Sequence, residues 1–232
     1  MKNLLLFLFF CISYNFSYAQ KTEYSVQLGS GFFSFTGNGA ATNSYEYSTQ
    51  FNGNGVGNPL GKKYGFSIFG GGEFKHINKA NFLYGAEVNY ESLTSKVKID
   101  TAVESFFIYS KTPVNATSYY VNKFLSLSPF IGKRFSHKHL SFDLKAGADL
   151  AFLLSNSLKV KYDENATEIV FAKDKKPVID FRIRAGVCTY FKNIGLGIEY
   201  SKGINNWYTN DYQQMNATSS FLRFSIKYLI KK

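Results

Sequence analysis

An alternation of apolar and polar residues recurs along the chain after its first twenty positions. It is cleanest over residues 140–152, where the even-numbered positions from Leu140 to Phe152 are apolar and the odd-numbered positions are mostly Ser, Asp, Lys or Gly. Because successive side chains of a strand point to opposite faces, this period of two predicts a strand with one apolar face. The alternation is longer than the about five or six residues of a soluble strand, and it suits a tilted strand that crosses a membrane.

Seven further segments repeat the pattern, so the sequence predicts eight strands. These segments are residues 23–35, 64–74, 82–91, 119–135, 179–191, 194–201 and 218–230. Two of them are irregular: Pro129 predicts a local distortion because it cannot donate to a ladder, and Gly29 to Gly31 predict a bulge that changes the parity before Phe33 and Phe35. An even number of strands is expected of a closed bacterial barrel.

The connections between these segments alternate between short and long. The short ones fall near residues 77–80, 136–139 and 192–193, and the long ones are residues 36–62, 93–118, 154–177 and 202–217. Outer-membrane barrels join their strands by short periplasmic turns and long extracellular loops. The sequence therefore predicts an all-β fold, an eight-stranded antiparallel up-and-down transmembrane β-barrel of OmpA/OmpX-like size, with both termini in the periplasm.

The first nineteen residues have the layout of a secretory signal peptide. A lysine supplies a positive start, residues 4–12 are uniformly apolar, and Ser17 and Ala19 place small residues before a cleavage point. The apolar run is too short for a stable transmembrane helix. We therefore predict a signal peptide over residues 1–19, an outer-membrane barrel domain over residues 20–232, and a mature protein integral to the bacterial outer membrane.

Composition narrows the class of protein further. The chain has 24 Phe and 17 Tyr among 232 residues, too many aromatics for a disordered chain, and two Cys, too few for a disulfide scaffold. A mean hydropathy of −0.17 argues against a bundle of membrane helices. A soluble exported β-barrel that binds a small ligand would show the same alternation with its apolar face turned inward, and it stays open as an alternative. Long strands and nearly uncharged apolar faces favour the membrane barrel.

The polar faces of the predicted strands collect seven acidic and seven basic residues that would face the lumen. They are Glu73, Lys75, Glu87, Glu91, Arg134, Asp143, Lys145, Asp149, Asp180, Arg182, Arg184, Glu199, Arg223 and Lys227. The interior of an eight-stranded barrel is just wide enough for side chains to fill, and buried charges must be paired. The balanced set predicts a salt-bridged lumen that is closed. The alternative is a narrow porin-like channel for small solutes or ions.

Residues that could carry catalysis are not grouped in the sequence. The three histidines, His76, His137 and His139, all fall at predicted periplasmic turns, where we expect them to be solvated. Cys188 has inward parity and is expected to act as an inert small side chain. No catalytic, cofactor-binding or metal-binding site is predicted, and we do not expect an enzyme.

The formal net charge of +11 points to partners of the opposite sign. Much of the excess lies in predicted loops, turns and the tail, at Lys62, Lys63, Lys111, Lys173, Lys175, Lys176, Lys202, Lys231 and Lys232. Nucleic acid is a poor partner for an exported chain, whereas lipopolysaccharide and anionic lipid headgroups of the outer membrane attract basic side chains. We also expect the four long loops to be able to contact an envelope protein, and the barrel to be a monomer.

Three stretches of the sequence resemble a known family. Residues 124–135 (FLSLSPFIGKRF), residues 195–206 (GLGIEYSKGINN) and residues 180–186 are similar to strands of the PorT-like outer-membrane β-barrel proteins of Bacteroidetes. The resemblance implies an eight-stranded barrel of the cell envelope, acting as a structural or interaction protein or, as in one branch, as a component of secretion and gliding machinery. The chain departs from the expected pattern at its end, where residues 228–232 lack a terminal aromatic.

Overall fold

A computed structural model describes residues 19–49, 53–105, 109–138, 140–162, 168–172, 179–207 and 215–231. The predicted signal peptide lies outside the described residues, apart from its last position. Eleven strands form within the described ranges: β1 (Ala19–Thr36), β2 (Asn43–Thr49), β3 (Gly53–Val56), β4 (Lys63–Asn78), β5 (Phe82–Ser105), β6 (Tyr109–His137), β7 (Leu140–Tyr162), β8 (Glu168–Ala172), β9 (Ile179–Phe191), β10 (Ile194–Gly203) and β11 (Thr218–Lys231).

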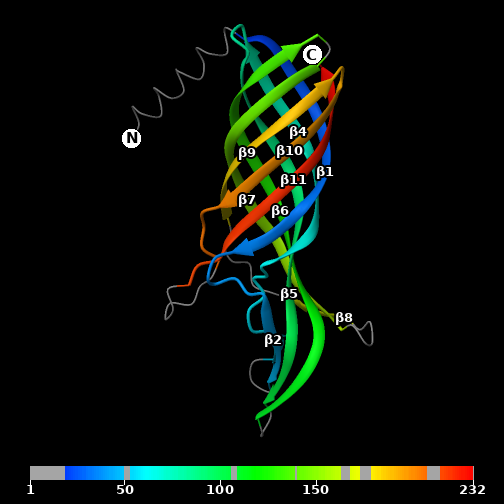
Figure 1. Cartoon of the computed structure of the whole chain (residues 1–232), viewed down its shortest axis with the longest axis vertical. Helices are drawn as coiled ribbons and strands as arrows, with labels where there is room; N and C mark the ends of the chain where they lie inside the picture. Colours follow the sequence, from blue (N-terminus) through cyan, green and yellow to red (C-terminus); the bar gives the residue numbers. More distant parts are fainter. Residues whose placement is uncertain are drawn as a thin grey trace.

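Eight of these strands close into a barrel (Figure 1). Going round the barrel, β1 pairs with β4, β4 with β5, β5 with β6, β6 with β7, β7 with β9, β9 with β10, β10 with β11, and β11 with β1 again. Every one of these pairings is antiparallel, and each barrel strand neighbours the next along the chain. The predicted eight-stranded, antiparallel, up-and-down barrel is therefore confirmed.

One end of the barrel holds the tight turns together with both ends of the described chain. Ala19 pairs with Asn78 beside the β4–β5 turn, and Lys231 pairs with Tyr24. The three tight turns use a left-handed backbone, with φ of 61° at Asn81, 50° at Lys138 and 55° at Lys192. We call this end the turn end. Figure 1 shows that the opposite end continues into a long projection.

The prediction of loops at residues 93–118 and 154–177 is wrong, because most of the described residues there belong to strands. β5 and β6 run on as one antiparallel ladder from Phe82 with Lys133 up to Ser105 with Tyr109, with a register shift between Ile99 and Thr101. β7 continues to Tyr162 and pairs with β8, while β2, which lies within predicted loop 36–62, adds to β5 in parallel. We call the part of β5, β6 and β7 beyond the barrel, together with β2, β3 and β8, the extension.

The bulge predicted at Gly29 to Gly31 does not form. The ladders of β1 with β4 and β11 are continuous there, and their register shifts fall before Val26. The parity of β1 is therefore kept: Phe33 and Phe35 point inward and are fully buried, whereas Phe32 points outward and is 45 % exposed. At Pro129 the β6–β7 ladder is locally interrupted, because residues 128 and 129 have no register partner on β7. The register is the same on both sides of this gap, so the gap is not a bulge, and the register shift of the ladder lies between Lys123 and Phe124.

The outer wall of the barrel carries a band of exposed apolar side chains on all eight strands. We call this band the apolar belt. Its members include Val26, Leu28, Phe66, Ile68, Val88, Tyr90, Leu125, Leu127, Leu144, Phe152, Ile183, Val187, Leu196, Ile198, Phe224 and Ile226, which are between 39 % and 72 % exposed. An apolar patch that encircles a protein is far larger than soluble monomers expose.

Candidate functional site: a filled lumen and its extension

The barrel interior is occupied by charged side chains. All fourteen residues predicted to face the lumen are buried, and the most exposed of them, Arg134, retains 7 % exposure. Each takes part in at least one ion pair. The sequence thus located the side chains, but not which of them meet. The pairs fall into three layers along the barrel.

In the middle layer, two lysines neutralise two glutamates. Glu73 and Glu87 are register partners on β4 and β5, a position in which like charges repel. Lys227 Nζ lies 2.7 Å from Glu73 Oε2 and 2.9 Å from Glu87 Oε1, and Lys145 Nζ lies 2.9 Å and 2.8 Å from the same two atoms. Arg184 adds a third cation, 2.7 Å from Glu87. The two glutamates are therefore held together by cations from β7, β9 and β11.

The layer nearer the extension is built on two arginines. Arg182 contacts Glu91 at 2.8 Å and Asp180 at 2.6 Å. Arg223 contacts Glu91 and Asp149 at 2.8 Å each. Charge-assisted hydrogen bonds of this length are the strong class, and they tie β5, β7, β9 and β11 across the lumen.

The layer nearest the turn end contains a carboxylate, that of Glu23, which is not among the fourteen predicted lumen residues. Arg134 binds Glu23 through Nη1 and Nη2, at 2.8 Å and 2.9 Å, and contacts Asp143 at 2.5 Å. The neighbouring Tyr24 faces outward and is 43 % exposed, so the period of two in a strand turns Glu23 inward. With Glu23, the lumen of the described chain holds eight acids and seven bases, so the predicted balance needs correction. Lys21, which is partly exposed at the mouth, lies 2.8 Å from Glu23 and supplies the eighth cation.

Aromatic rings close the charged region from both sides. Towards the extension, the guanidinium carbon of Arg182 lies 4.9 Å from the ring of Phe124, and that of Arg223 lies 4.7 Å from the ring of Phe221. Towards the turn end, Lys75 Nζ lies 4.1 Å from the ring of Tyr190. Cations over ring faces gain energy when water is excluded.

Glycines on the inner wall make room for these rings. A Cβ added to Gly29 would lie 2.4 Å from the ring of Phe69, and one added to Gly195 would lie 2.6 Å from the ring of Tyr190. Both distances are below any real contact, so the rings occupy the space that other side chains would need. The charged layers and the rings together fill the cross-section of the barrel.

The interior of the extension is apolar and continues directly from this lumen. Its buried cluster includes Phe33, Phe35, Leu60, Phe69, Leu93, Val97, Ile99, Tyr120, Phe124, Leu158, Val160, Trp207 and Phe221. Phe35 lies at the centre, with its ring centroid 5.2 Å from those of Phe33 and Trp207. Trp207 also donates from Nε1 to Asp180 at 3.2 Å, which links the apolar cluster to the charged layers.

Strand β5 shows how the two interiors meet. Its inward positions are polar within the barrel, at Glu87, Asn89 and Glu91, and largely apolar from Leu93 onward. Its outward positions change in the opposite sense, from Val88 and Tyr90 to Ser92, Thr94, Lys96 and Lys98. The parity of the strand never changes. The polarity of the wall therefore reverses at residues 91–93, and this reversal explains why the segment beyond it was predicted to be a loop.

Two tyrosines lie within the extension. Burial raises the pKa of Tyr120 to about 12, although a hydrogen bond donated by Asn156 at 2.9 Å lowers it. The Tyr162 hydroxyl donates to the carboxylate of Glu46, so β7 is joined to β2 across the extension. Burial, this hydrogen bond and the charge of Glu46 raise the pKa of Tyr162. Both phenols are neutral at ordinary pH.

The remaining candidates for chemistry lie apart from one another. His76 was predicted to be solvated, but it is 7 % exposed on the wall of β4, between Phe74 and Tyr84, and bonds Thr22 at 2.8 Å. His137 is exposed at the end of β6, and His139 lies outside the described residues. Cys188 is buried. Across the described ranges, no three His, Cys, Asp or Glu side chains are grouped to hold a metal ion.

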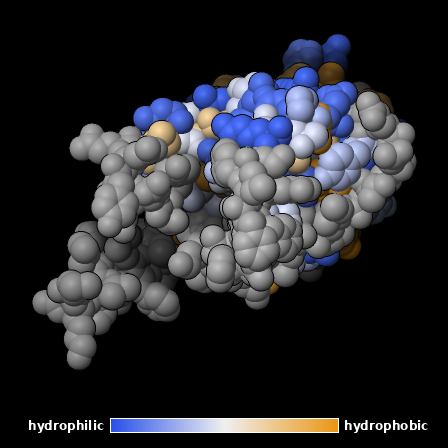
Figure 2. Space-filling model, turned by 90° about the horizontal axis from the view of Figure 1, so that it is seen from below, coloured by the Kyte–Doolittle hydropathy of each residue, from blue (hydrophilic) through white to orange (hydrophobic). Residues whose placement is uncertain are grey.

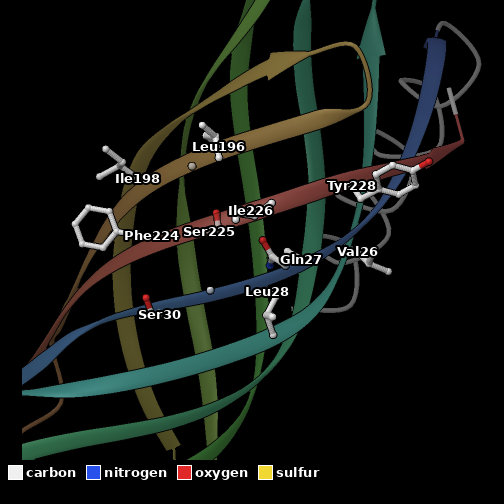
Figure 3. Close-up of a pocket in the computed structure, with 12 residues that line it drawn as sticks. Val26, Gln27, Leu28, Ser30, Leu196, Ile198, Phe224, Ser225, Ile226 and Tyr228 are labelled. Carbon is white, nitrogen blue, oxygen red and sulfur yellow. The ribbon is translucent and has the colours of Figure 1, made fainter.

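A hollow interrupts the apolar belt over β1, β10 and β11 (Figure 3). Its volume is about 840 Å³, and most of its lining side chains belong to the belt, among them Leu28, Leu196, Ile198 and Phe224. It therefore continues the apolar surface. No helix long and apolar enough to cross a membrane occurs in the described part of the chain.

Comparison with known proteins finds similarity at the level of solved structures. No protein-family profile and no curated protein sequence matches the chain. Neisserial surface protein A is 13 % identical, with a TM-score of 0.42, over 90 % of this chain and 99 % of the other. Ail, the attachment invasion locus protein of Yersinia pestis, is 8 % identical with a TM-score of 0.38 in complex with the heparin analogue sucrose octasulfate, and 9 % identical with a TM-score of 0.37 alone; both alignments cover 90 % of this chain and 100 % of Ail. Ail is an outer membrane protein.

Proposed function

We propose that this protein is an integral β-barrel of the bacterial outer membrane whose lumen is closed and whose extension stands outside the membrane as a surface for interaction. The observation that carries the proposal is the reversal of wall polarity along β5. Inside the barrel, the polar side chains of β5 face the lumen and its apolar side chains face outward. Beyond residue 93, the inward side chains are largely apolar and the outward side chains are polar. Such an arrangement suits a chain whose barrel is surrounded by lipid and whose extension is surrounded by water.

The filled lumen supports a structural or interaction role over transport. Ion pairs in three layers and aromatic rings at both sides occupy the space through which a solute would pass. Opening a path for a solute through the lumen would require breaking buried ion pairs. Each broken pair would leave uncompensated charges in a buried site, which is strongly destabilising. The closed lumen therefore makes the barrel a rigid support for the extension.

The origin and export of the chain are part of the same proposal. The residues over 1–19 have the layout of a signal peptide, and the three stretches that resemble PorT-like proteins support a role in the cell envelope of a Bacteroidetes species, as a structural component or a partner in secretion or gliding. The extension supplies the surface for an envelope partner in place of the flexible loops first expected. The barrel itself acts as a monomer.

Conductance across a lipid bilayer tests the closed lumen. The purified, refolded protein is inserted into a planar bilayer, and insertion is verified by heat-modifiable migration on a gel. We expect no conductance above that of the lipid alone, with a refolded porin as positive control. Stable unitary currents would show that the protein is a narrow channel, and recovery as a soluble periplasmic protein would overturn the membrane assignment altogether.

A further inference from the structure

The hollow over β1, β10 and β11 lies in the side wall of the barrel, within the apolar belt. Its outward lining includes two register rows, Ser30 with Phe224 and Ile198, and Leu28 with Ile226 and Leu196. Ser30 is short and partly buried, whereas the apolar side chains around it are 39 % to 72 % exposed, so the wall is depressed at the serine. Figure 2, which views the molecule from the extension, shows by contrast a mainly hydrophilic described surface.

The side of the hollow nearer the turn end is amphipathic. Tyr228 lines it, and in Figure 3 the phenol hydroxyl points away from the other lining side chains. Tyr228 is the register partner of Ile194, which pairs with Phe191 across the β9–β10 turn. Lys192 in that turn is exposed, and its Nζ lies 5.6 Å from the ring centroid of Phe191. A phenol and an ammonium group therefore lie beyond the hollow on the turn-end side.

The dimensions of the hollow fit one leaflet of a membrane. Its lining runs from Val26 to Ser30 on β1 and from Tyr228 to Phe224 on β11, which is about 13 Å of strand at about 3.3 Å per residue. The hydrocarbon of one leaflet is about 15 Å deep, half of a core of about 30 Å. The volume of about 840 Å³ lies within the range of about 300–1,000 Å³ that ligand sites occupy.

The described turn end exposes cations and keeps its carboxylates inside. Four lysines are exposed there: Lys79, Lys133, Lys138 and Lys192. The acidic side chains at this end, those of Glu23 and Asp143, face the lumen, where both contact Arg134. Eight acidic residues of the sequence lie outside the lumen; four are in the extension and four follow strands that run towards it: Glu46, Asp100, Glu104, Glu168, Asp163, Glu164, Asp174 and Asp211. The outer surface of the turn end therefore complements an anionic headgroup.

We propose that the hollow binds an anionic glycerophospholipid of the leaflet at the turn end, an inference that rests on the proposed function. The acyl chains lie over Ser30, and the headgroup phosphate lies against Lys192 and the hydroxyl of Tyr228. Ammonium and phenol groups donate charge-assisted hydrogen bonds to phosphate oxygens, and basic side chains gain energy near anionic lipid. Acyl chains in the depression also gain contacts that a flat wall does not offer.

Phosphatidylglycerol is the probe, and phosphatidylcholine with the same acyl chains is its zwitterionic counterpart. The refolded protein in neutral detergent is titrated with each lipid, and bound lipid is counted by native mass spectrometry. Ser30→Phe fills the hollow, and Lys192→Gln removes the cation.

Each of these variants has a matched control across the barrel, on β6 and β7. Ala146→Phe adds the same ring at an exposed outward position of β7. Lys138→Gln removes the lysine that occupies the left-handed position of the β6–β7 turn, as Lys192 does in its own turn.

We expect Ser30→Phe to bind phosphatidylglycerol about tenfold more weakly, because the added ring occupies the place of the acyl chains. Lys192→Gln should bind it about fivefold more weakly and lose the preference of the wild type for phosphatidylglycerol over phosphatidylcholine. Ala146→Phe and Lys138→Gln should match the wild type. Glycerol phosphate, which carries the phosphate without acyl chains, should not compete.

Equal binding by the two phenylalanine variants overturns the inference, and so does equal binding by the two glutamine variants. Wild-type protein that binds both lipids equally overturns the assignment of the headgroup, and competition by glycerol phosphate overturns the assignment to a membrane lipid. All variants are checked for heat-modifiable migration, and Ser30→Leu takes the place of Ser30→Phe if the ring prevents folding. A protein that inserts into bilayers but fails these tests still satisfies the proposed function, whereas one that does not insert overturns both.

Discussion

The barrel and the extension are built from the same strands with opposite inside–outside chemistry. In the barrel, β5 turns Glu87 and Glu91 inward and Val88 outward; in the extension it turns Val97 and Ile99 inward and Lys98 outward. The strand parity is continuous, so the backbone does not determine which face is apolar. The difference teaches that the surrounding solvent sets the pattern: a strand in lipid needs an apolar outer face, and a strand in water needs an apolar core.

The largest expected effect comes from breaking the charged interior of the barrel. Arg223→Met leaves Glu91 and Asp149 each without one cation in a buried site. We expect a loss of about 3–5 kcal/mol in unfolding free energy, because a buried charge without its partner is strongly destabilising. Urea unfolding in lipid vesicles measures the loss. Arg223→Lys, which keeps a cation, is the control, and a loss below about 1 kcal/mol for Arg223→Met would contradict the account.

The apolar interior of the extension responds to a different change. Leu158→Ala removes a buried side chain that is 1 % exposed, and we expect a cost of about 2–5 kcal/mol. The cost falls on the extension, so limited proteolysis there should accelerate while the barrel keeps its heat-modifiable migration on a gel. Equal destabilisation of both regions would show that they do not differ as described.

The outer faces of the two regions give a matched pair of substitutions. Ile183→Arg places a charge in the apolar belt, where Ile183 is 60 % exposed, and we expect a cost of about 2–4 kcal/mol in a bilayer. Thr117→Arg makes the same charge change on the outer face of the extension, where we expect less than about 0.5 kcal/mol. Vesicle unfolding of both variants measures the difference. Similar costs at the two sites would mean that both face the same solvent.

The smallest effect is expected where the two interiors join. Trp207→Phe keeps a ring in the aromatic cluster but removes the hydrogen bond to Asp180. We expect a loss of about 1–2 kcal/mol, since Asp180 keeps its ion pair with Arg182. Differential scanning calorimetry in detergent measures the shift, and an unchanged melting temperature would show that this bond does not couple the two regions.

The sequence predicts the barrel better than the extension for a physical reason. Alternation with apolar residues on one parity located eight strands and the fourteen lumen charges. Glu23 was not in the predicted set, although it precedes the outward-facing Tyr24 and the same parity turns it inward. It failed beyond Leu93 because the apolar residues there move to the inward parity and are diluted by Lys, Ser and Thr. The partners of each charge depend on the register across the lumen, which the sequence does not specify.

Thiol labelling along β5 tests the reversal of polarity most directly. Single cysteines at Val88 and Lys98, both outward, are made in a Cys188→Ala background and placed in lipid nanodiscs, where both membrane surfaces are open to reagent. We predict that a membrane-impermeant maleimide labels Lys98→Cys rapidly and leaves Val88→Cys unlabelled until the protein is unfolded. Equally rapid labelling at the two positions would contradict the claim that lipid surrounds the barrel and water surrounds the extension.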